Sequence, residues 1–393
     1  MPGARPDSPP AVILGNTGSA LSLTRSLGRA GVGVYVLGSQ GSSVAGVSRY
    51  CSAFVELGGA QGWLDWLERE GPSGAVLLPP GDEGVELIVR QRQRLEKRGY
   101  RLPETAGETS LAMLDKSRTY QLARAAGIPC PRTWSVRDET DLEELSGRLP
   151  FPCALKPVHS HLFARHFPVK VLLAGDAQEL LGHLARTLEL GLEMLVTEVI
   201  PGPETATWTY STYLDDLGEP VFGLTRNKLR SYPVHFGTNS YLVTRWQPEV
   251  AWAGLRFLRG IGLRGLAHVE FKRDPRDGEL KLIECNHRFV NVNEVLRRAG
   301  LDVALFTYRR ALGQSTPRMD GWREDVRLWF PARDLRAARE YRREGQLTWP
   351  GWLRSLAHTR LYTPVLAFDD PWPAAAGAWR KLRRRVPRAA AAA

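Results

Sequence analysis

The chain has no apolar run long enough to cross a membrane. A membrane-spanning helix needs about 20 consecutive apolar residues, and no hydrophobic stretch in the 393-residue sequence approaches that length. The first ten residues, MPGARPDSPP, also lack the apolar region of a signal peptide. The sequence therefore predicts a cytoplasmic protein, and its 43% hydrophobic and 24% charged residues are typical of a soluble globular one.

Cysteine is scarce. The four cysteines are far apart and show neither a zinc-type Cys-x-x-Cys spacing nor the framework of a small disulfide-rich domain: Cys51, Cys130, Cys153 and Cys285. We therefore expect ordinary buried thiols.

Acidic residues are fewer than basic ones, which gives a formal net charge of +11. A nucleic-acid partner would explain such a balance, but the arginines are spread along the chain and the densest cluster, Arg380–Arg388, lies in the tail. No module that combines aromatic and basic residues for nucleic-acid binding is visible. Acidic small substrates or an anionic surface explain the charge equally well, so the sequence does not favour a nucleic-acid partner.

The N-terminal region lacks the glycine pattern of a dinucleotide site. AVILGNTGSALSLTRSLGRAGVGVYVLGS predicts strand, turn, helix and strand, which is a βαβ unit. Its turn contains Gly15 and Gly18 without the G-x-G-x-x-G spacing, so a tight strand-to-helix turn is the plainer account and a nicotinamide site the alternative. Further on, Asp82 follows the carboxyl end of another strand, where open α/β sheets bind ligands, although helix capping would also explain it.

Two acidic residues that face each other across a hairpin are predicted in the segment 265–288. GLAHVEFKRD and GELKLIECN are typical strands, and the Pro-Arg-Asp-Gly run between them predicts a hairpin turn. With the turn near Asp277, Glu270 lies opposite Glu284, and Asn286 and Arg288 share their face. Opposed side chains are about 5 Å apart at Cβ, where like charges repel. A bound Mg²⁺ would remove that conflict; a solvated polar face is the alternative.

Other charged residues stand at the ends of predicted elements. MLDKSRTYQLARAAGIPCPRTW predicts a helix with Lys116 in its first turn, where a cation opposes the helix dipole and an anion would be favoured. PFPCALKPVHS places Lys156 at the end of an apolar strand. Another strand ends at Glu198, and a Pro-Gly break separates it from Glu204. Taken singly, such residues are usually found at a surface.

In this order, the pieces resemble the ATP-grasp superfamily. The resemblance covers about residues 105 to 315. The phrases PVFGLTRNKLRSYPVHFGTNSYLV and LIECNHRFVNVNEVLRRAGLDV bring it closest to the carboxylate-amine ligases, including those similar to D-aspartate ligase.

The resemblance implies a fold that combines α/β and α+β parts. A Rossmann-like parallel α/β domain is expected over residues 1–108, before a two-lobed ATP-grasp fold. The small lobe would span 109–195 with a linker helix, and the large lobe with the metal site 196–318. A helical extension rich in Trp and Arg would follow over 319–393; its tryptophans are expected to pack on the main body, with a membrane interface as the alternative.

The resemblance also implies roles for single residues. Lys116 and Lys156 would contact the ATP phosphates. The hinge Glu198-Val199-Ile200 would meet the adenine edge through its backbone, and Glu204 would bind the ribose hydroxyls. The implied metal ligands, which would hold two Mg²⁺, are Glu270, Glu284 and Asn286. Arg288 would stabilise the transferring phosphoryl group.

Substrate contacts are open to more than one interpretation. Arg226, Lys228 and Arg230 would carry charge towards phosphate or the acid substrate, or would form a basic solvated turn. Asn291 and Asn293 would line the substrate pocket, although Asn293 would also cap a helix. The loop after Lys156, VHSHLFARHFPVK, lacks the glycines with which many ATP-grasp enzymes close over phosphates, so side-chain contacts, including one from Lys170, are the alternative there.

These implications describe an ATP-dependent carboxylate-amine ligase, with Lys156 and Arg288 as its catalytic residues. It would form an amide through an acyl phosphate and release ADP and phosphate. The expected substrates are small carboxylates and amines, among them amino acids or a larger precursor, and an oligomer is compatible with the sequence. The alternatives are a non-catalytic nucleotide-binding protein of the same fold and a nucleotide-dependent oxidoreductase based on the βαβ unit.

Overall fold

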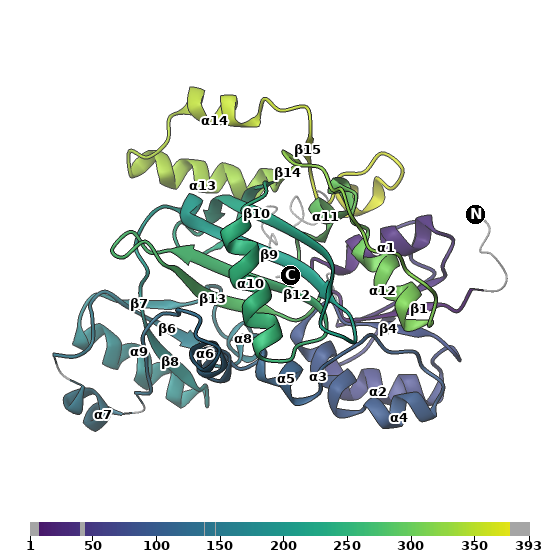
Figure 1. The fold of residues 1–393 in the computed structure, drawn as a ribbon, viewed down its shortest axis with the longest axis horizontal. Helices are drawn as coiled ribbons and strands as arrows, with labels where there is room; N and C mark the ends of the chain where they lie inside the picture. Colours follow the sequence, from purple (N-terminus) through teal and green to yellow (C-terminus); the bar gives the residue numbers. More distant parts are fainter. Residues whose placement is uncertain (1–7, 40–43, 137, 146, 378–393) are drawn as a thin grey trace, which may run out of the picture. The chain divides into compact units, whose positions relative to one another are not determined.

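The computed structural model describes residues 8–39, 44–136, 138–145 and 147–377, and the contacts divide the chain into two compact units (Figure 1). Unit 1 combines residues up to Pro103 with 289–316 and the described residues from Thr363 on. Unit 2 combines Glu104–Arg288 with Pro317–Tyr362. Each unit is therefore assembled from segments distant in sequence. The basic run Arg380–Arg388 lies outside the described residues.

Unit 1 contains a four-stranded parallel sheet in the order β3-β2-β1-β4. Its strands are β1 (Ala11–Leu14), β2 (Val34–Gly38), β3 (Ala53–Glu56) and β4 (Val76–Leu78). Its helices are α1 (Ala20–Arg29), α2 (Gly59–Arg69), α3 (Asp82–Arg90), α4 (Arg92–Lys97), α11 (Asn293–Ala299) and α12 (Val303–Ala311). The predicted βαβ unit is confirmed, because β1 and β2 pair in parallel on either side of α1 in sequence.

The two late segments of unit 1 are tied to α1 by polar contacts. Ser26 in α1 donates a hydrogen bond to Asp302, which caps α12. Arg25 forms a buried ion pair with Asp370 at 2.8 Å, and Arg29 pairs with Asp369 at 2.7 Å. The Asp-Asp-Pro motif of the chain's last part therefore anchors that segment to the first helix of the protein.

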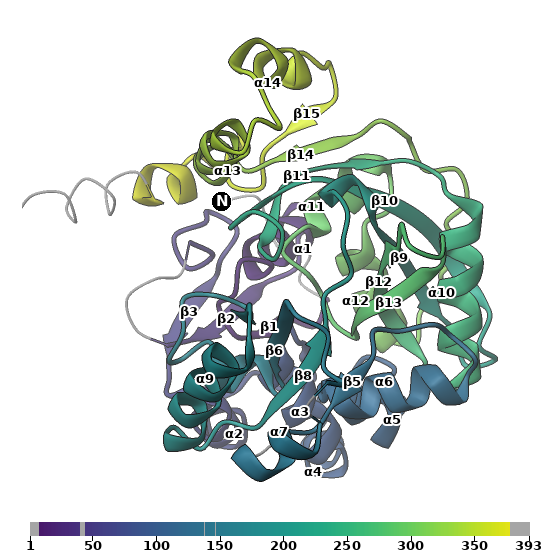
Figure 2. The same ribbon diagram turned by 90° about the vertical axis from the view of Figure 1, so that its left-hand side faces the viewer.

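Unit 2 begins with a small antiparallel sheet in the order β5-β8-β6-β7. Its strands are β5 (Thr133–Trp134), β6 (Cys153–Pro157), β7 (Leu172–Ala174) and β8 (Met194–Glu198). The helices of this region are α5 (Glu108–Ala112), α6 (Lys116–Ala125), α7 (Glu139–Glu144), α8 (Ser160–Phe163) and α9 (Ala177–Glu189). Leu180 and Leu184 of α9 pack on Leu155 and Val196, so this amphipathic helix covers the sheet (Figure 2).

A seven-stranded sheet in the order β13-β12-β9-β10-β11-β14-β15 completes unit 2. Its strands are β9 (Thr207–Leu214), β10 (Pro220–Tyr232), β11 (Thr238–Thr244), β12 (Gly265–Arg273), β13 (Leu280–Asn286), β14 (Arg327–Trp329) and β15 (Leu361–Tyr362). Around it lie the short turn η1 (Glu204–Ala206) and the helices α10 (Pro248–Gly260), α13 (Pro331–Arg343) and α14 (Trp349–Leu356). The extension expected to be helical thus also supplies two strands.

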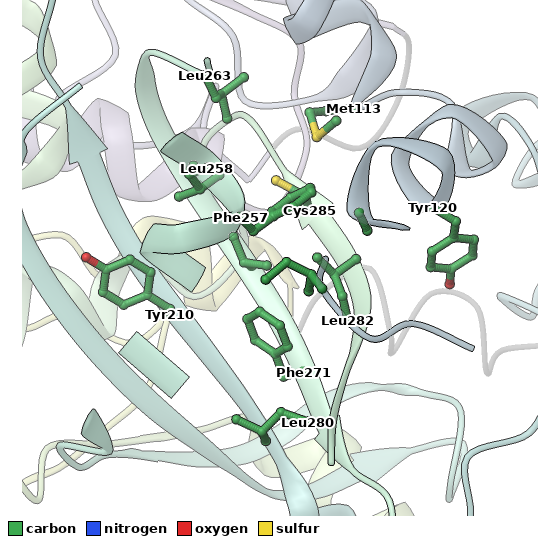
Figure 3. Close-up of a cluster of buried hydrophobic side chains, with 14 of the residues drawn as sticks. Met113, Tyr120, Tyr210, Phe257, Leu258, Leu263, Phe271, Leu280, Leu282 and Cys285 are labelled. Carbon is green, nitrogen blue, oxygen red and sulfur yellow. The ribbon is translucent and has the colours of Figure 1, made fainter. Parts of the chain in front are cut away.

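The main core of unit 2 lies on one face of this sheet. Figure 3 shows Phe257 and Leu258 of α10 beside Phe271 of β12, with Leu282 and Cys285 of β13 in the same buried cluster. Because side chains alternate along β12, His268 and Glu270 point to the opposite face. In β13 a register shift between Leu282 and Glu284 turns Glu284 to that face as well. The core therefore determines which face is left for polar chemistry.

The fold-class prediction of mixed α/β and α+β parts is confirmed. All four cysteines are free thiols, as expected. Within the described ranges, no helix combines the length and apolar character that crossing a membrane requires.

Candidate active site on the large sheet

Glu270 and Glu284 face each other across the β12–β13 hairpin. The register pairs them directly, as predicted, and pairs His268 with Asn286. Asn286 donates a hydrogen bond through Nδ2 to Glu284 Oε1 at 3.0 Å, so both lie on one face. The row continues across the sheet, because β9 places Thr209 beside Glu270. The facing-acid prediction is therefore confirmed as geometry.

Basic residues from several elements surround these carboxylates. Burial favours the neutral form of Glu284, but Lys170, Lys116 and the Asn286 hydrogen bond outweigh it and lower the pKa of Glu284 to about 2. Glu284 is thus a carboxylate at neutral pH, in a field of positive charge.

Lys228 of β10 joins two acids of the site. Its Nζ lies 3.2 Å from Glu270 Oε1 and 4.0 Å from Glu204 Oε2. Burial disfavours the ammonium, yet Glu270 and Glu204 together raise the pKa of Lys228. Oε1 of Glu204 is buried and has no hydrogen-bond partner among the described residues. This oxygen of Glu204 is therefore available to accept a hydrogen bond from a ligand hydroxyl.

Lys156, in β6 next to its final residue, is linked to the hairpin through Tyr120. Its Nζ donates a hydrogen bond to the Tyr120 hydroxyl at 3.2 Å, and that hydroxyl donates to the Ile283 carbonyl at 2.8 Å. Burial lowers the pKa of Lys156, while Glu284 and Glu270 oppose the shift. Sequence reasoning missed Tyr120, although it lies four residues after Lys116 and so on the same side of α6.

Lys116 begins α6, where the side chain of Asp115 caps the helix by accepting from the backbone of Arg118. Its Nζ donates a hydrogen bond to Ser160 at the start of α8. The glycine-poor loop thus contacts Lys116 through a side chain. Lys116 and Lys156, the two lysines expected to contact ATP phosphates, therefore both come from the region of the small sheet.

The segment after β8 is held by arginines and a lysine. The Glu198 carboxylate pairs with Arg132 at 2.6 Å and with Arg276 at 3.3 Å. The carbonyl of Ile200 accepts a hydrogen bond from Lys272 at 2.9 Å. These contacts fix the backbone on both sides of Val199. The three basic residues, Arg132, Arg276 and Lys272, were not expected from the sequence.

Arg226, Ser211 and His268 form a buried polar group beside the acids. Arg226 donates to Ser211 Oγ, and His268 Nδ1 lies 2.9 Å from the same oxygen. Burial lowers the pKa of Arg226 to about 10, against the pull of Glu270 and Glu284. Burial, with Arg226 and Arg288 nearby, holds the pKa of His268 well below its ordinary value. His268 was missed, although its place two residues before Glu270 could have revealed it.

The donor set fits Mg²⁺. No group of three His, Cys, Asp or Glu side chains suited to a metal occurs within the described ranges, so a site here depends on two carboxylates and one amide oxygen. Oxygen donors of this kind are those that Mg²⁺ prefers, and it commonly completes its shell with substrate phosphates and water. Glu270, Glu284 and Asn286 would hold it.

No family model matches the chain. D-aspartate ligase of Enterococcus faecium is 28% identical over 241 residues, which are 59% of this chain and 57% of that protein. D-alanine--D-alanine ligase of Stutzerimonas stutzeri is 26% identical over 208 residues, which are 49% of this chain and 62% of that protein. The chain thus matches less than two thirds of the length of these relatives. The solved L-amino acid ligase from Bacillus licheniformis has a TM-score of 0.60 at 15% identity, covering 78% of this chain and 74% of its own. In sequence and in fold, the chain is similar to ligases of the ATP-grasp superfamily.

Arg230 lies apart from the acids. Its guanidinium binds Asp334 through Nε at 2.8 Å and Nη2 at 2.7 Å, and donates to Ser355 at 3.0 Å. A buried arginine engaged in this way has little left to offer a ligand. We therefore leave Arg230 out of the proposed substrate contacts.

The other expected substrate residues belong to unit 1. Asp82 is the first residue of α3, directly after the loop that follows β4. Asn291 lies so close to Gly18 that an added Cβ there would meet its Oδ1 at 2.9 Å. Asn293 begins α11, accepts from the backbone of Val290 at 3.2 Å and leaves a buried Nδ2 without a partner among the described residues.

Proposed function

We propose that this chain is an ATP-dependent carboxylate-amine ligase. The observation that carries the proposal is the direct pairing of Glu270 with Glu284, next to Lys156 and Lys228. Two half-buried acids, with half-buried lysines and the buried Arg226 around them, are costly to assemble for stability alone. They suit a polyphosphate that arrives with a divalent metal. In this proposal the two lobes expected over residues 109–195 and 196–318 hold the nucleotide, with 289–316 of the second range assigned to unit 1 by the contacts.

The nucleotide would lie between the small-sheet region and the large sheet of unit 2. Lys116 and Lys156 would bind its phosphates, with Lys228 beside the metal ligands. The backbone of Glu198, Val199 and Ile200 would meet the adenine edge, in an orientation fixed by the contacts of Arg132, Arg276 and Lys272. The orphaned Oε1 of Glu204 supports a role in accepting hydrogen bonds from the ribose hydroxyls.

The reaction would proceed through an acyl phosphate. A carboxylate resists attack by an amine at neutral pH, so its oxygen must first become part of a leaving group. Transfer of the γ-phosphoryl group of ATP supplies that group, and positioning with charge neutralisation provides most of the catalysis. Lys156 and Arg288 would stabilise the transferring group. Bound Mg²⁺ would neutralise phosphate charge, and the amine would then displace phosphate to give the amide, ADP and phosphate.

Amino acids are the substrates that the relatives support. Two of the similar proteins are named for D-aspartate and D-alanine, and each name places an amino acid in the bond that is formed. Arg226 is the residue of unit 2 best suited to an acid, because its buried guanidinium has no carboxylate partner among the described residues. Asp82, Asn291 and Asn293 remain proposed contacts from unit 1.

The test is ADP formation from MgATP with pools of L- and D-amino acids as both acid and amine, followed by mass spectrometry of the products. Glu284→Gln should lower the rate at least about 100-fold, since even indirect supports of metal ligands are worth 10–100-fold. Glu279→Gln is the matched control: this exposed acid of the same hairpin contacts Lys281 at 2.6 Å and should leave the rate unchanged.

Two outcomes would replace the proposal by an alternative. Tight ATP binding without ADP formation in any pool would indicate a non-catalytic nucleotide-binding protein. Tight nicotinamide binding without ADP formation would support the alternative hypothesis, a nucleotide-dependent oxidoreductase based on the N-terminal βαβ unit. Equal rates for Glu284→Gln and Glu279→Gln would remove the facing acids from the mechanism.

A further inference from the structure

His268 has one ring nitrogen with a hydrogen-bond partner and one without. The residue is 1% exposed and stands in β12 opposite Asn286, on the face that carries Glu270 and Glu284. Within the part of the chain that the structure describes, Nε2 is buried and bonded to nothing. A buried polar atom without a partner costs about 1–3 kcal/mol. Because Nε2 lies on the sheet face that carries Glu270 and Glu284, a bound ligand could supply its missing hydrogen-bond partner.

Ser211 determines where the imidazole proton lies. Arg226 can only donate, so Ser211 Oγ accepts its hydrogen bond. The Ser211 hydroxyl proton remains available for a second hydrogen bond, and we assign it to His268 Nδ1, which lies 2.9 Å from Oγ. With Nδ1 accepting, a neutral His268 carries its proton on Nε2. An imidazolium would carry one there as well. Nε2–H is therefore a donor in both protonation states, at the end of a chain of donors that polarise one another.

Arg226 indicates the charge of the missing acceptor. It is 6% exposed, and no described residue pairs a carboxylate with its guanidinium. An uncompensated buried cation is unfavourable. An oxygen that bears negative charge, or that develops it during a reaction, would satisfy both Arg226 and the donor chain.

We propose that His268 is a catalytic residue that donates a hydrogen bond from Nε2 to the acyl oxygen of the activated acid. This role presupposes the ligase reaction proposed above. Asn286, its cross-strand neighbour, belongs to the proposed metal set, so His268 would meet the acid on the side next to the phosphoryl-transfer centre. Ser211 and Arg226 act through His268 as positioning residues.

The donor acts when the amine attacks. The nitrogen lone pair forms the new N–C bond, and the carbonyl π electrons move onto the acyl oxygen, where Nε2–H stabilises the charge without transferring its proton. Those electrons then reform the carbonyl as the C–O bond to phosphate breaks. The bonding pair leaves with the phosphate, which also takes the proton that the amine loses. Donors aimed at such an oxygen are worth about 10²–10³ in kcat.

A pair of substitutions separates the two ring nitrogens. His268→Asn keeps an oxygen near the Nδ1 position for Ser211 but has no donor at Nε2. His268→Gln places its amide nitrogen near Nε2. We expect His268→Asn to lower kcat for amide formation about 100-fold, with MgATP affinity and amine-independent acyl phosphate formation retained. Hydroxylamine trapping measures the acyl phosphate. His268→Gln should recover most of the rate.

His287→Asn is the matched control, because His287 is a buried histidine of the same hairpin segment whose Nδ1 contacts the Leu266 carbonyl at 2.8 Å, and asparagine can keep that bond. It should retain the wild-type kcat. The role of His268 is overturned if Asn and Gln at position 268 behave alike, or if the loss appears in MgATP affinity.

A second measurement needs no turnover. The ¹⁵N spectrum of histidine-labelled protein should show a protonated Nε2 at His268, and this signal should shift when an amino acid from the pool is added with Mg²⁺ and adenylyl imidodiphosphate. Wild-type protein that forms no ADP refutes the proposed ligase function. An Nδ1–H tautomer, or an Nε2 signal that no acid moves, refutes the role of His268 instead.

Discussion

Arg226 and Arg230 are buried arginines four residues apart in β10, and they have opposite surroundings. Arg230 binds both oxygens of Asp334, which also accepts from Ser240 at 2.9 Å. The indoles of Trp329 and Trp352 donate to the same carboxylate at 3.1 and 2.9 Å. Among the residues that the structure describes, Arg226 donates its hydrogen bond to Ser211 and pairs with no carboxylate. One guanidinium is fully paired within the protein, and the other is not.

The contrast between the two arginines distinguishes a structural role from a functional one on the same strand, β10. The pair of Arg230 and Asp334 joins β10 to α13 and resembles the satisfied polar networks that hold a fold together. The group of Arg226, Ser211 and His268 leaves a buried cation and a buried ring nitrogen unmatched. Unmatched polar atoms are tolerated where a ligand supplies the missing partner. Matching, rather than burial, therefore distinguishes the two arginines.

The largest effect is expected from breaking the matched pair. Asp334→Asn would leave Arg230 as an uncompensated buried charge, and loss of one partner of such a pair costs about 3–5 kcal/mol. The midpoint of urea unfolding should fall accordingly. Asp325→Asn, at an exposed acid that pairs with Arg327, is the control and should cost less than about 1 kcal/mol. A loss at Asp334 as small as the control's would show that the network contributes little.

Arg226 should show the reverse pattern, because its loss should lower activity rather than stability. Arg226→Met removes a buried cation that no described carboxylate pairs with directly, so the urea midpoint should stay the same or rise. The rate of ADP formation should fall about 10–100-fold, as for a residue that supports a reacting group. Arg230→Met should instead lower stability. If the two methionine variants lose stability equally, the comparison between the arginines fails.

Tyr120 lies between the two cases, because its hydroxyl is matched on both sides yet contacts Lys156. Tyr120→Phe should cost about 1 kcal/mol of stability, the usual worth of a hydrogen bond. It should also weaken MgATP binding a few-fold, since Lys156 loses the acceptor that orients it. Isothermal titration with MgATP would measure this. Unchanged affinity would mean that Lys156 needs no such support.

The smallest effect is expected at a matched but exposed pair. Hydrogen bonding by Arg29 holds the pKa of Asp369 well below its usual range. Because the folded-state pKa lies below the unfolded value of about 3.9, this stabilisation is present above about pH 4 and is lost as pH falls further. Asp369→Asn should cost less than about 1 kcal/mol at neutral pH. Urea midpoints between pH 3 and pH 7 test this: the variant should show a flatter acid limb, and an unchanged limb would contradict it.

Much of the site's backbone was predictable because its signals are local. The alternation of β12 and β13 and the turn residues between them predicted the hairpin and the pairing of Glu270 with Glu284, although the register shift beside Phe271 was not predicted. The start of α6 at Lys116 and the end of β8 at Glu198 follow from similar local patterns. The partners of buried charges were not predictable. Nothing near Arg230 in sequence indicates Asp334, which lies 104 residues further on.

The sequence by itself determined which residues share a strand face, and so brought two acids, an amide and His268 together. Side-chain direction repeats every two residues and needs no distant contact. Tertiary structure alone decided which charges are matched, because pairing of distant strands and helices brings the counter-charges. It joined β14 to β11 and brought Asp334 to Arg230. Among the described residues, it left Arg226 without a carboxylate partner and Nε2 of His268 without a hydrogen-bond partner.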